Sequence, residues 1–212
     1  MTWKTIFNPF GKFNDIHLLI TGIIFFIVNI FGCYYSGNVN DSIFHLSHLD
    51  ENQTIWDVAR INSLSFLFAI IILFILAKFF NNRTRIIDII NTILISAIPL
   101  IIIMPVYGMS FFKNATDSVT KSAGDPGQVE TINLIIVTAF ALATLPLMIY
   151  SFVLYYNGFK TATNIKKWQH IVLFVVVSLI LIIASQTILY TKYNSMKTKL
   201  LLVLILLAQT FY

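Results

Sequence analysis

The chain contains one cysteine and few charged residues. Because Cys33 stands alone, an intrachain disulfide and a cysteine zinc site are both excluded. Charged residues make up 11% of the 212 residues, whereas soluble domains average about 25%. Hydrophobic residues make up 58%, and the mean hydropathy is +0.83. In water such a chain would expose a large apolar surface, so the composition predicts an integral membrane protein.

The apolar residues gather in runs that are long enough to cross a bilayer, which takes about 20 residues. Five runs qualify, at 16–35, 61–80, 86–107, 131–156 and 168–190. The first run exceeds the roughly 7–15 apolar residues of a cleavable signal peptide, so we expect it to remain as an anchor.

These runs divide the chain into three parts. We predict an all-α membrane protein in which a cytoplasmic segment at 1–15 precedes a bundle of five transmembrane helices at 16–190. A short, signal-like apolar segment follows at 191–212.

The positions of the basic residues predict the orientation, because lysine and arginine in short loops stay cytoplasmic. The N-terminal segment, the 78–85 turn and the 157–167 loop together hold eight basic residues. The loops at 36–60 and 108–130 hold three basic residues and seven of the nine acids. We therefore expect a cytoplasmic N-terminus. The many Asn, Ile, Lys and Phe residues are typical of an AT-rich bacterial genome, so we expect the membrane to be a bacterial inner (cytoplasmic) membrane. The basic residues lie in short clusters between apolar runs, which predicts no nucleic-acid partner.

The C-terminal stretch "MKTKLLLVLILLAQTFY" at 196–212 resembles the start of a signal peptide. Its apolar core at 200–208 has nine residues, too few for an ordinary span. It fits an interfacial helix or a short sixth span, and a fossil signal sequence from a neighbouring reading frame is compatible with both. We predict that 196–210 lie along the outer face of the bilayer.

Polar residues in the third run fall on one helical face at about 100° per residue. They are Asp88, Asn91, Thr92, Ser96 and Pro99. Polar groups in lipid usually face other helices or a cavity, so this face predicts either helix packing or a transport pathway.

Asp88 lies one turn inside the expected cytoplasmic end of this run, close to Arg83 and Arg85. This spacing favours an interfacial salt bridge, and a proton or ion site is the alternative. Pro99 and Pro105 remove backbone donors and are expected to kink or end the helix.

Two other runs carry polar residues of the helix-packing type. Asn29 lies on one line with Gly22 and Cys33 in the first run, and Gln186 lies beside Ser185 in the fifth. Small residues allow close approach of helices, and amide side chains hydrogen-bond across them.

The stretch "HLSHLDE" at 45–51 places His45 and His48 at i, i+3, where a helix would put both on one face. A zinc site needs three or four ligands, and the two outer loops hold no further histidine. Loop histidines on a solvated surface are therefore the favoured interpretation. The sequence contains no zinc-protease helix motif, nucleophile elbow or phosphate-binding loop. We expect no enzyme activity, cofactor or metal.

Three stretches resemble bacterial members of the Yip1 family: "WKTIFNPFGKF" at 3–13, "TRIIDIINTILISAIPL" at 84–100 and "YYNGFKTATNIKKWQHI" at 155–171. The resemblance covers about residues 3–190. The matching positions are Asn8, Pro9, Phe10, Asp88, Asn91, Pro99, Gly158, Phe159 and Lys160.

The resemblance implies a five-helix membrane protein with a cytoplasmic N-terminus. Eukaryotic relatives bind Rab GTPases, but this chain lacks their Asp-Leu-Tyr-Gly-Pro motif, so that partner is not expected here. Some bacterial relatives accompany multi-component ABC exporters. The resemblance therefore implies a non-enzymatic accessory subunit or scaffold whose partners are the lipid bilayer and other membrane subunits. A small transporter or channel using the third-run face is the alternative.

Overall fold

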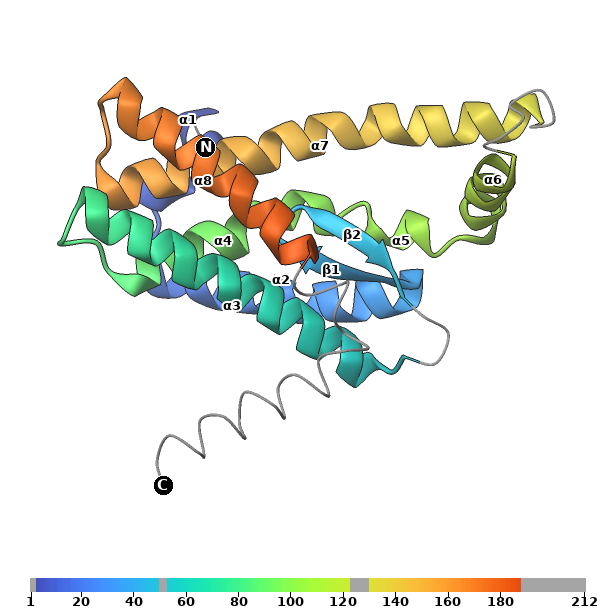
Figure 1. Cartoon of the computed structure of the whole chain (residues 1–212), viewed down its shortest axis with the longest axis horizontal. Coiled ribbons are helices and arrows are strands. Elements are labelled where there is room, and N and C mark those ends of the chain that lie inside the picture. Colours follow the sequence, from blue (N-terminus) through green and yellow to red (C-terminus); the bar gives the residue numbers. More distant parts are fainter. Residues whose placement is uncertain (1–2, 50–52, 123–129, 188–212) are drawn as a thin grey trace.

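The computed structural model describes residues 3–49, 53–122 and 130–187 (Figure 1). Most of these residues are helical. The elements are α1 (Trp3–Phe7), η1 (Pro9–Gly11), α2 (Asp15–Ser36), β1 (Asn38–Ser42), β2 (His45–His48), α3 (Ile55–Phe80), α4 (Ile86–Ile101), α5 (Met104–Tyr107), α6 (Ser110–Lys121), α7 (Thr131–Thr163) and α8 (Trp168–Ser185).

Four of the described helices are long and apolar enough to cross a membrane: α2, α3, α7 and α8. The helix α4 is apolar but has 16 residues, which span about 24 Å at 1.5 Å per residue. The prediction of a mostly helical membrane protein is confirmed. The predicted count of five spans is not confirmed. The predicted interfacial helix at 196–210 lies outside the described residues.

The third apolar run forms two helices where the sequence predicted one. The helix α4 ends at Ile101, and a separate turn, α5, begins at Met104 with Pro105 in its first positions. Pro99 lies inside α4. Each proline lacks the N–H that would continue the backbone ladder, which accounts for the break.

The fold also departs from the all-α prediction by a short antiparallel hairpin, β1–β2, between α2 and α3. Gly37 ends α2 with a left-handed φ of 72°, and its carbonyl accepts the Leu49 N–H at 2.9 Å. Val39 and Ile43 are buried, so the hairpin is part of the core.

The hairpin corrects the helical interpretation of the two histidines. Both lie on β2, and residues three apart on a strand point to opposite faces. His45 Nδ1 lies 2.8 Å from Asp41 Oδ1. Among the described residues, no group of three or more His, Cys, Asp or Glu is arranged to hold a metal ion.

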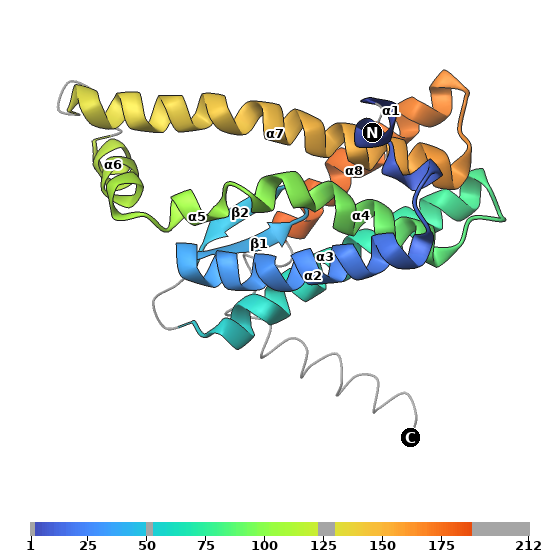
Figure 2. The same cartoon turned by 180° about the vertical axis from the view of Figure 1, so that it is seen from behind.

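The helices alternate in direction (Figures 1 and 2). The N-terminal segment, the α3–α4 turn and the α7–α8 turn lie at one end of the molecule, while the hairpin, α5 and α6 lie toward the other. The three segments rich in basic residues thus share one end. Which side of the membrane this end faces stays a prediction.

The helix α7 is longer than the predicted run at 131–156. It has 33 residues, and its N-terminal half extends beyond the bundle, where α6 lies across it (Figure 1). Phe140 packs there against the rings of Phe112 and Tyr107, with centroid distances of 4.3 and 4.9 Å.

Candidate functional site

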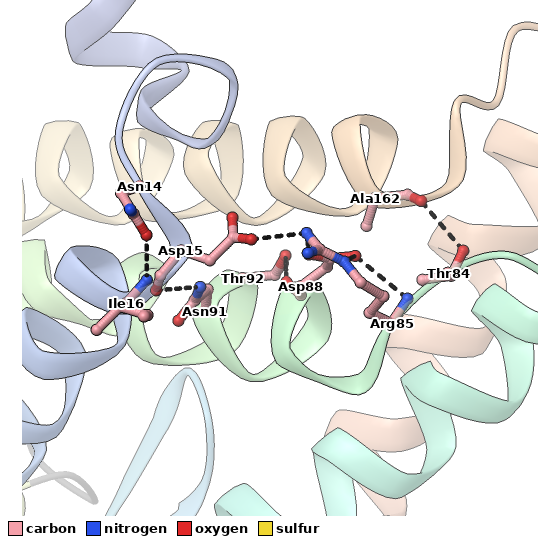
Figure 3. A network of polar contacts seen from close by, with 9 residues as sticks. All are labelled: Asn14, Asp15, Ile16, Thr84, Arg85, Asp88, Asn91, Thr92 and Ala162. Atoms are coloured by element: carbon pink, nitrogen blue, oxygen red, sulfur yellow. Dashed lines mark hydrogen bonds and ion pairs between the residues drawn. The ribbon is translucent and has the colours of Figure 1, made fainter.

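The first turn of α4 holds an ion pair at the end of the molecule where the basic segments gather (Figure 3). Arg85 Nη2 lies 2.6 Å from Asp88 Oδ1, and the backbone N–H of Arg85 donates to Asp88 Oδ2 at 3.2 Å. A carboxylate in the first turn also interacts favourably with the helix dipole. The predicted salt bridge is therefore present, with Arg85 as the partner of Asp88.

Arg85 also joins this turn to the start of α2. Its Nη2 lies 2.7 Å from Asp15 Oδ2, and Asn91 Nδ2 donates to the Asp15 carbonyl at 3.0 Å. The side chain of Asn14 caps α2 by accepting the Ile16 N–H at 2.9 Å. The hydrogen bonds that the Arg85 guanidinium donates to Asp88, and then to Asp15, raise its pKa, so this group stays charged.

The N-terminal segment is hydrogen-bonded to α7. The Tyr150 hydroxyl donates to the Ile6 carbonyl at 2.9 Å, and Asn157 Nδ2 donates to the Phe7 carbonyl at 2.8 Å. Asn8 Nδ2 donates to Thr161 Oγ1 at 3.3 Å. Residues 150, 157 and 161 share one face of α7 because their spacings are close to whole helical turns.

Gly158 lets α7 lie close to both α4 and the N-terminal segment. A Cβ at this position would lie 2.6 Å from Thr92 Oγ1 and 2.9 Å from Phe10 Cζ. Thr92 is fully buried and its hydroxyl donates to the Asp88 carbonyl at 2.7 Å. Glycine is therefore required here for close packing.

These contacts surround a cavity of about 130 Å³. Its lining comes from three segments that are far apart in the sequence: Phe10, Asp15, Leu18, Arg85, Asp88, Asn91, Gly158, Thr161 and Ala162. Asn91 Oδ1 is buried and has no hydrogen-bond partner among the described residues. The three stretches singled out in the sequence thus converge at one place.

The remaining predicted site residues lie apart from this cavity. Lys160 is exposed, with Nζ 5.6 Å from the Tyr156 ring centroid. Ser96 and Pro99 are buried deeper along α4, and the Ser96 hydroxyl donates to the Ile93 carbonyl of its own helix at 3.0 Å. Gln186 follows the last residue of α8.

Asn29 belongs to a second polar cluster beneath the hairpin. Its Nδ2 donates to Asn40 Oδ1 at 2.7 Å, and Cys33 Sγ lies 3.1 Å from the same oxygen. The backbone N–H of Asn40 donates to Asn62 Oδ1 at 2.8 Å. Asn29 thus binds β1, the strand that follows its own helix. Its predicted role in helix packing stays a prediction, as do the roles of the other candidates.

Sequence reasoning missed several residues of the first site, namely Asp15, Tyr150, Asn157 and Thr161. A signal for the α7 set was available, because polar side chains recur at 150, 157 and 161 along one face of an apolar run. Asp15 offered no such signal, since an acid at the start of a helix is ordinary.

Comparison with known protein families identifies the chain. The Yip1 domain matches residues 3–189, which include all three segments around the cavity. The chain belongs to the Yip1 family. No curated protein and no solved structure matches it significantly. The family is a membrane protein family that is not known for enzymes, so the site is best interpreted through its contacts.

Proposed function

We propose that this Yip1 family protein is a non-enzymatic accessory subunit or scaffold of the bacterial inner membrane, where it binds other membrane proteins. The observation that carries the proposal is the surface of α7. In the most apolar 18-residue stretch of this helix, no residue is buried in the part of the chain that the structure describes, although α7 is the longest helix described. Although Phe140 packs against Tyr107 and Phe112, an apolar stretch of this length that is left unburied is suited to an intermolecular contact.

The uncovered face of α7 has the composition of a helix–helix interface. Ala139 and Ala143 are both exposed and lie four residues apart on one face, with Ile135, Leu142 and Pro146 beside them. Small residues at this spacing let a second helix approach closely. Within the described residues, this pair contacts no other helix closely enough to be buried.

Purification in mild detergent tests the proposal. We expect wild-type protein to retain stoichiometric membrane partners and Ala139→Leu to lose them, because leucine holds the partner helix away. Ala141→Leu is the matched control, since Ala141 is exposed about 200° around the same helix. A clean monomer from wild-type cells, or equal retention by both variants, would contradict the proposal.

The finer assignment to a multi-component ABC-type exporter rests on the family resemblance alone. It predicts that the retained partners include an ABC-type ATPase or its membrane subunit. Mass spectrometry of the retained proteins tests this assignment separately, because other membrane partners would support the scaffold and refute the exporter.

We also propose five spans with a cytoplasmic N-terminus, with α4 as the third. In a Cys33→Ala background, Lys166→Cys between α7 and α8 is expected to react with an impermeant thiol reagent only after the cells are opened. Lys121→Cys at the end of α6 is expected to react in intact cells. The opposite labelling pattern would overturn the orientation.

A transporter or channel using the polar face of α4 is the second candidate. The cavity beside Asp88 and Asn91 favours it. Against it, Thr92 and Ser96 are fully buried, and their hydroxyls bond carbonyls of α4 itself. If this candidate is right, Asp88→Asn abolishes flux in reconstituted vesicles. Unchanged flux would contradict it, because Asp88 is the ionisable residue of the polar face of α4.

A further inference from the structure

A groove with a volume of about 280 Å³ lies between the N-terminal segment, α4 and α7. Its walls are almost entirely apolar and include Ile6, Phe13, Ile98, Pro99, Leu147 and Leu154. Tyr150 also lines it, but the hydroxyl of Tyr150 is hydrogen-bonded to the Ile6 carbonyl. The groove therefore offers apolar contacts to its occupant.

The N-terminal wall of this groove has the character of a membrane interface. Ile6 and Phe13 of this wall are exposed apolar side chains, and the same segment carries the polar Asn8 and Lys12. An exposed apolar side combined with basic residues is typical of chain lying at the boundary between headgroups and acyl chains. From this wall the groove follows α4 as far as Ile102, an exposed residue at the C-terminal end of that helix.

A basic side chain, that of Lys12, lies beside the N-terminal wall of the groove. Lys12 is exposed, and its Nζ donates to Oγ1 of Thr5, a residue of the groove wall, at 3.5 Å. An ammonium group at headgroup level attracts the phosphate of an anionic lipid. The charge and the apolar walls thus match the two halves of one phospholipid.

We propose that the groove binds one acyl chain of an anionic phospholipid whose phosphate contacts Lys12. A transmembrane helix from a partner is a poorer occupant, since a helix with its side chains is about 10–12 Å wide and Lys12 would meet no negative charge. The site is separate from the partner-binding face of α7 around Ala139, so either proposal can fail alone.

Native mass spectrometry of the full chain, with phosphatidylglycerol or phosphatidylcholine added in detergent, tests the proposal. We expect one tightly retained phosphatidylglycerol per chain. Lys12→Glu is expected to weaken its binding at least about fivefold, the effect of one basic residue near a lipid surface. Lys166→Glu is the control, because it makes the same charge change at the same end of the molecule.

The groove itself is tested with Leu147→Trp, whose indole fills it, against Ile149→Trp on an exposed position of the same helix. We expect only Leu147→Trp to lose the retained lipid while eluting as a single folded species. Equal effects of the two lysine variants would show general charge attraction and overturn the proposal. Unchanged lipid retention in a folded Leu147→Trp protein would also overturn the proposal. If Leu147→Trp does not fold, unchanged lipid retention in a folded Lys12→Glu protein would overturn it instead.

Discussion

Replacing Gly158 with alanine is expected to destabilise the protein by about 1–3 kcal/mol, the usual cost of an extra methyl group in a packed core. The added carbon would lie 2.6 Å from Thr92 Oγ1 and 2.9 Å from the ring of Phe10. Thr92 is a poor candidate to move, because its β-branched side chain has few helical rotamers and its hydroxyl is hydrogen-bonded to the Asp88 carbonyl. Thermal unfolding in detergent measures the loss.

Two further variants make this expectation specific. Gly11→Ala, in the N-terminal segment itself, should leave the unfolding temperature unchanged, since a Cβ there meets no atom within 4 Å. Adding Thr92→Ala to Gly158→Ala should recover part of the loss, as expected for residues in direct contact. Equal stability of the two glycine variants would show that the three segments do not pack as described.

The second large effect is expected beneath the hairpin. Asn40→Leu removes the acceptor of Asn29 Nδ2, which is buried in α2 and has no other acceptor among the described residues. A buried donor without a partner costs about 1–3 kcal/mol. Chemical or thermal unfolding should therefore show a clear loss of stability, although residue 40 lies in a loop of the predicted topology.

The paired variant separates the hydrogen bond from packing. Because replacing both partners with apolar groups is close to neutral, Asn29→Leu/Asn40→Leu should be more stable than Asn40→Leu alone. Ser65→Ala is the control for simple removal of a polar group, since the buried Ser65 hydroxyl has no hydrogen-bond partner in the described part of the chain. A double variant less stable than either single one would refute the assigned pair.

The sequence predicted the membrane helices well because long apolar runs have few alternatives in a bilayer. It also predicted that the basic segments share one end of the molecule. Loops rich in lysine and arginine stay on one side of a membrane, and successive spans run in opposite directions. The hairpin was missed because the loop at 36–60 is polar in sequence, whereas Val39 and Ile43 are buried by long-range packing. The break after Ile101 was anticipated in part, through Pro99 and Pro105.

The sequence singled out several residues of the candidate site but did not predict how they are arranged. Asp88, Asn91 and Gly158 were identified from family-like stretches, and all three line the same cavity. That Asp15 joins them depends on how α2 packs against α4, which local spacing does not encode. Lys160 comes from one of the same stretches, and Gln186 was singled out as a polar residue of the fifth run. Both lie outside this contact network, because the direction of a side chain and the place of its helix depend on neighbours.

Site-specific photocrosslinking in living cells tests the central claim, that the uncovered face of α7 binds another membrane protein. A photoreactive benzoylphenylalanine is placed at Ala143 and, in a separate strain, at Ala141; both positions are exposed on the same helix at nearly the same depth. We expect a discrete crosslinked protein from position 143 and none from position 141. Crosslinks to lipid alone from both positions would contradict it.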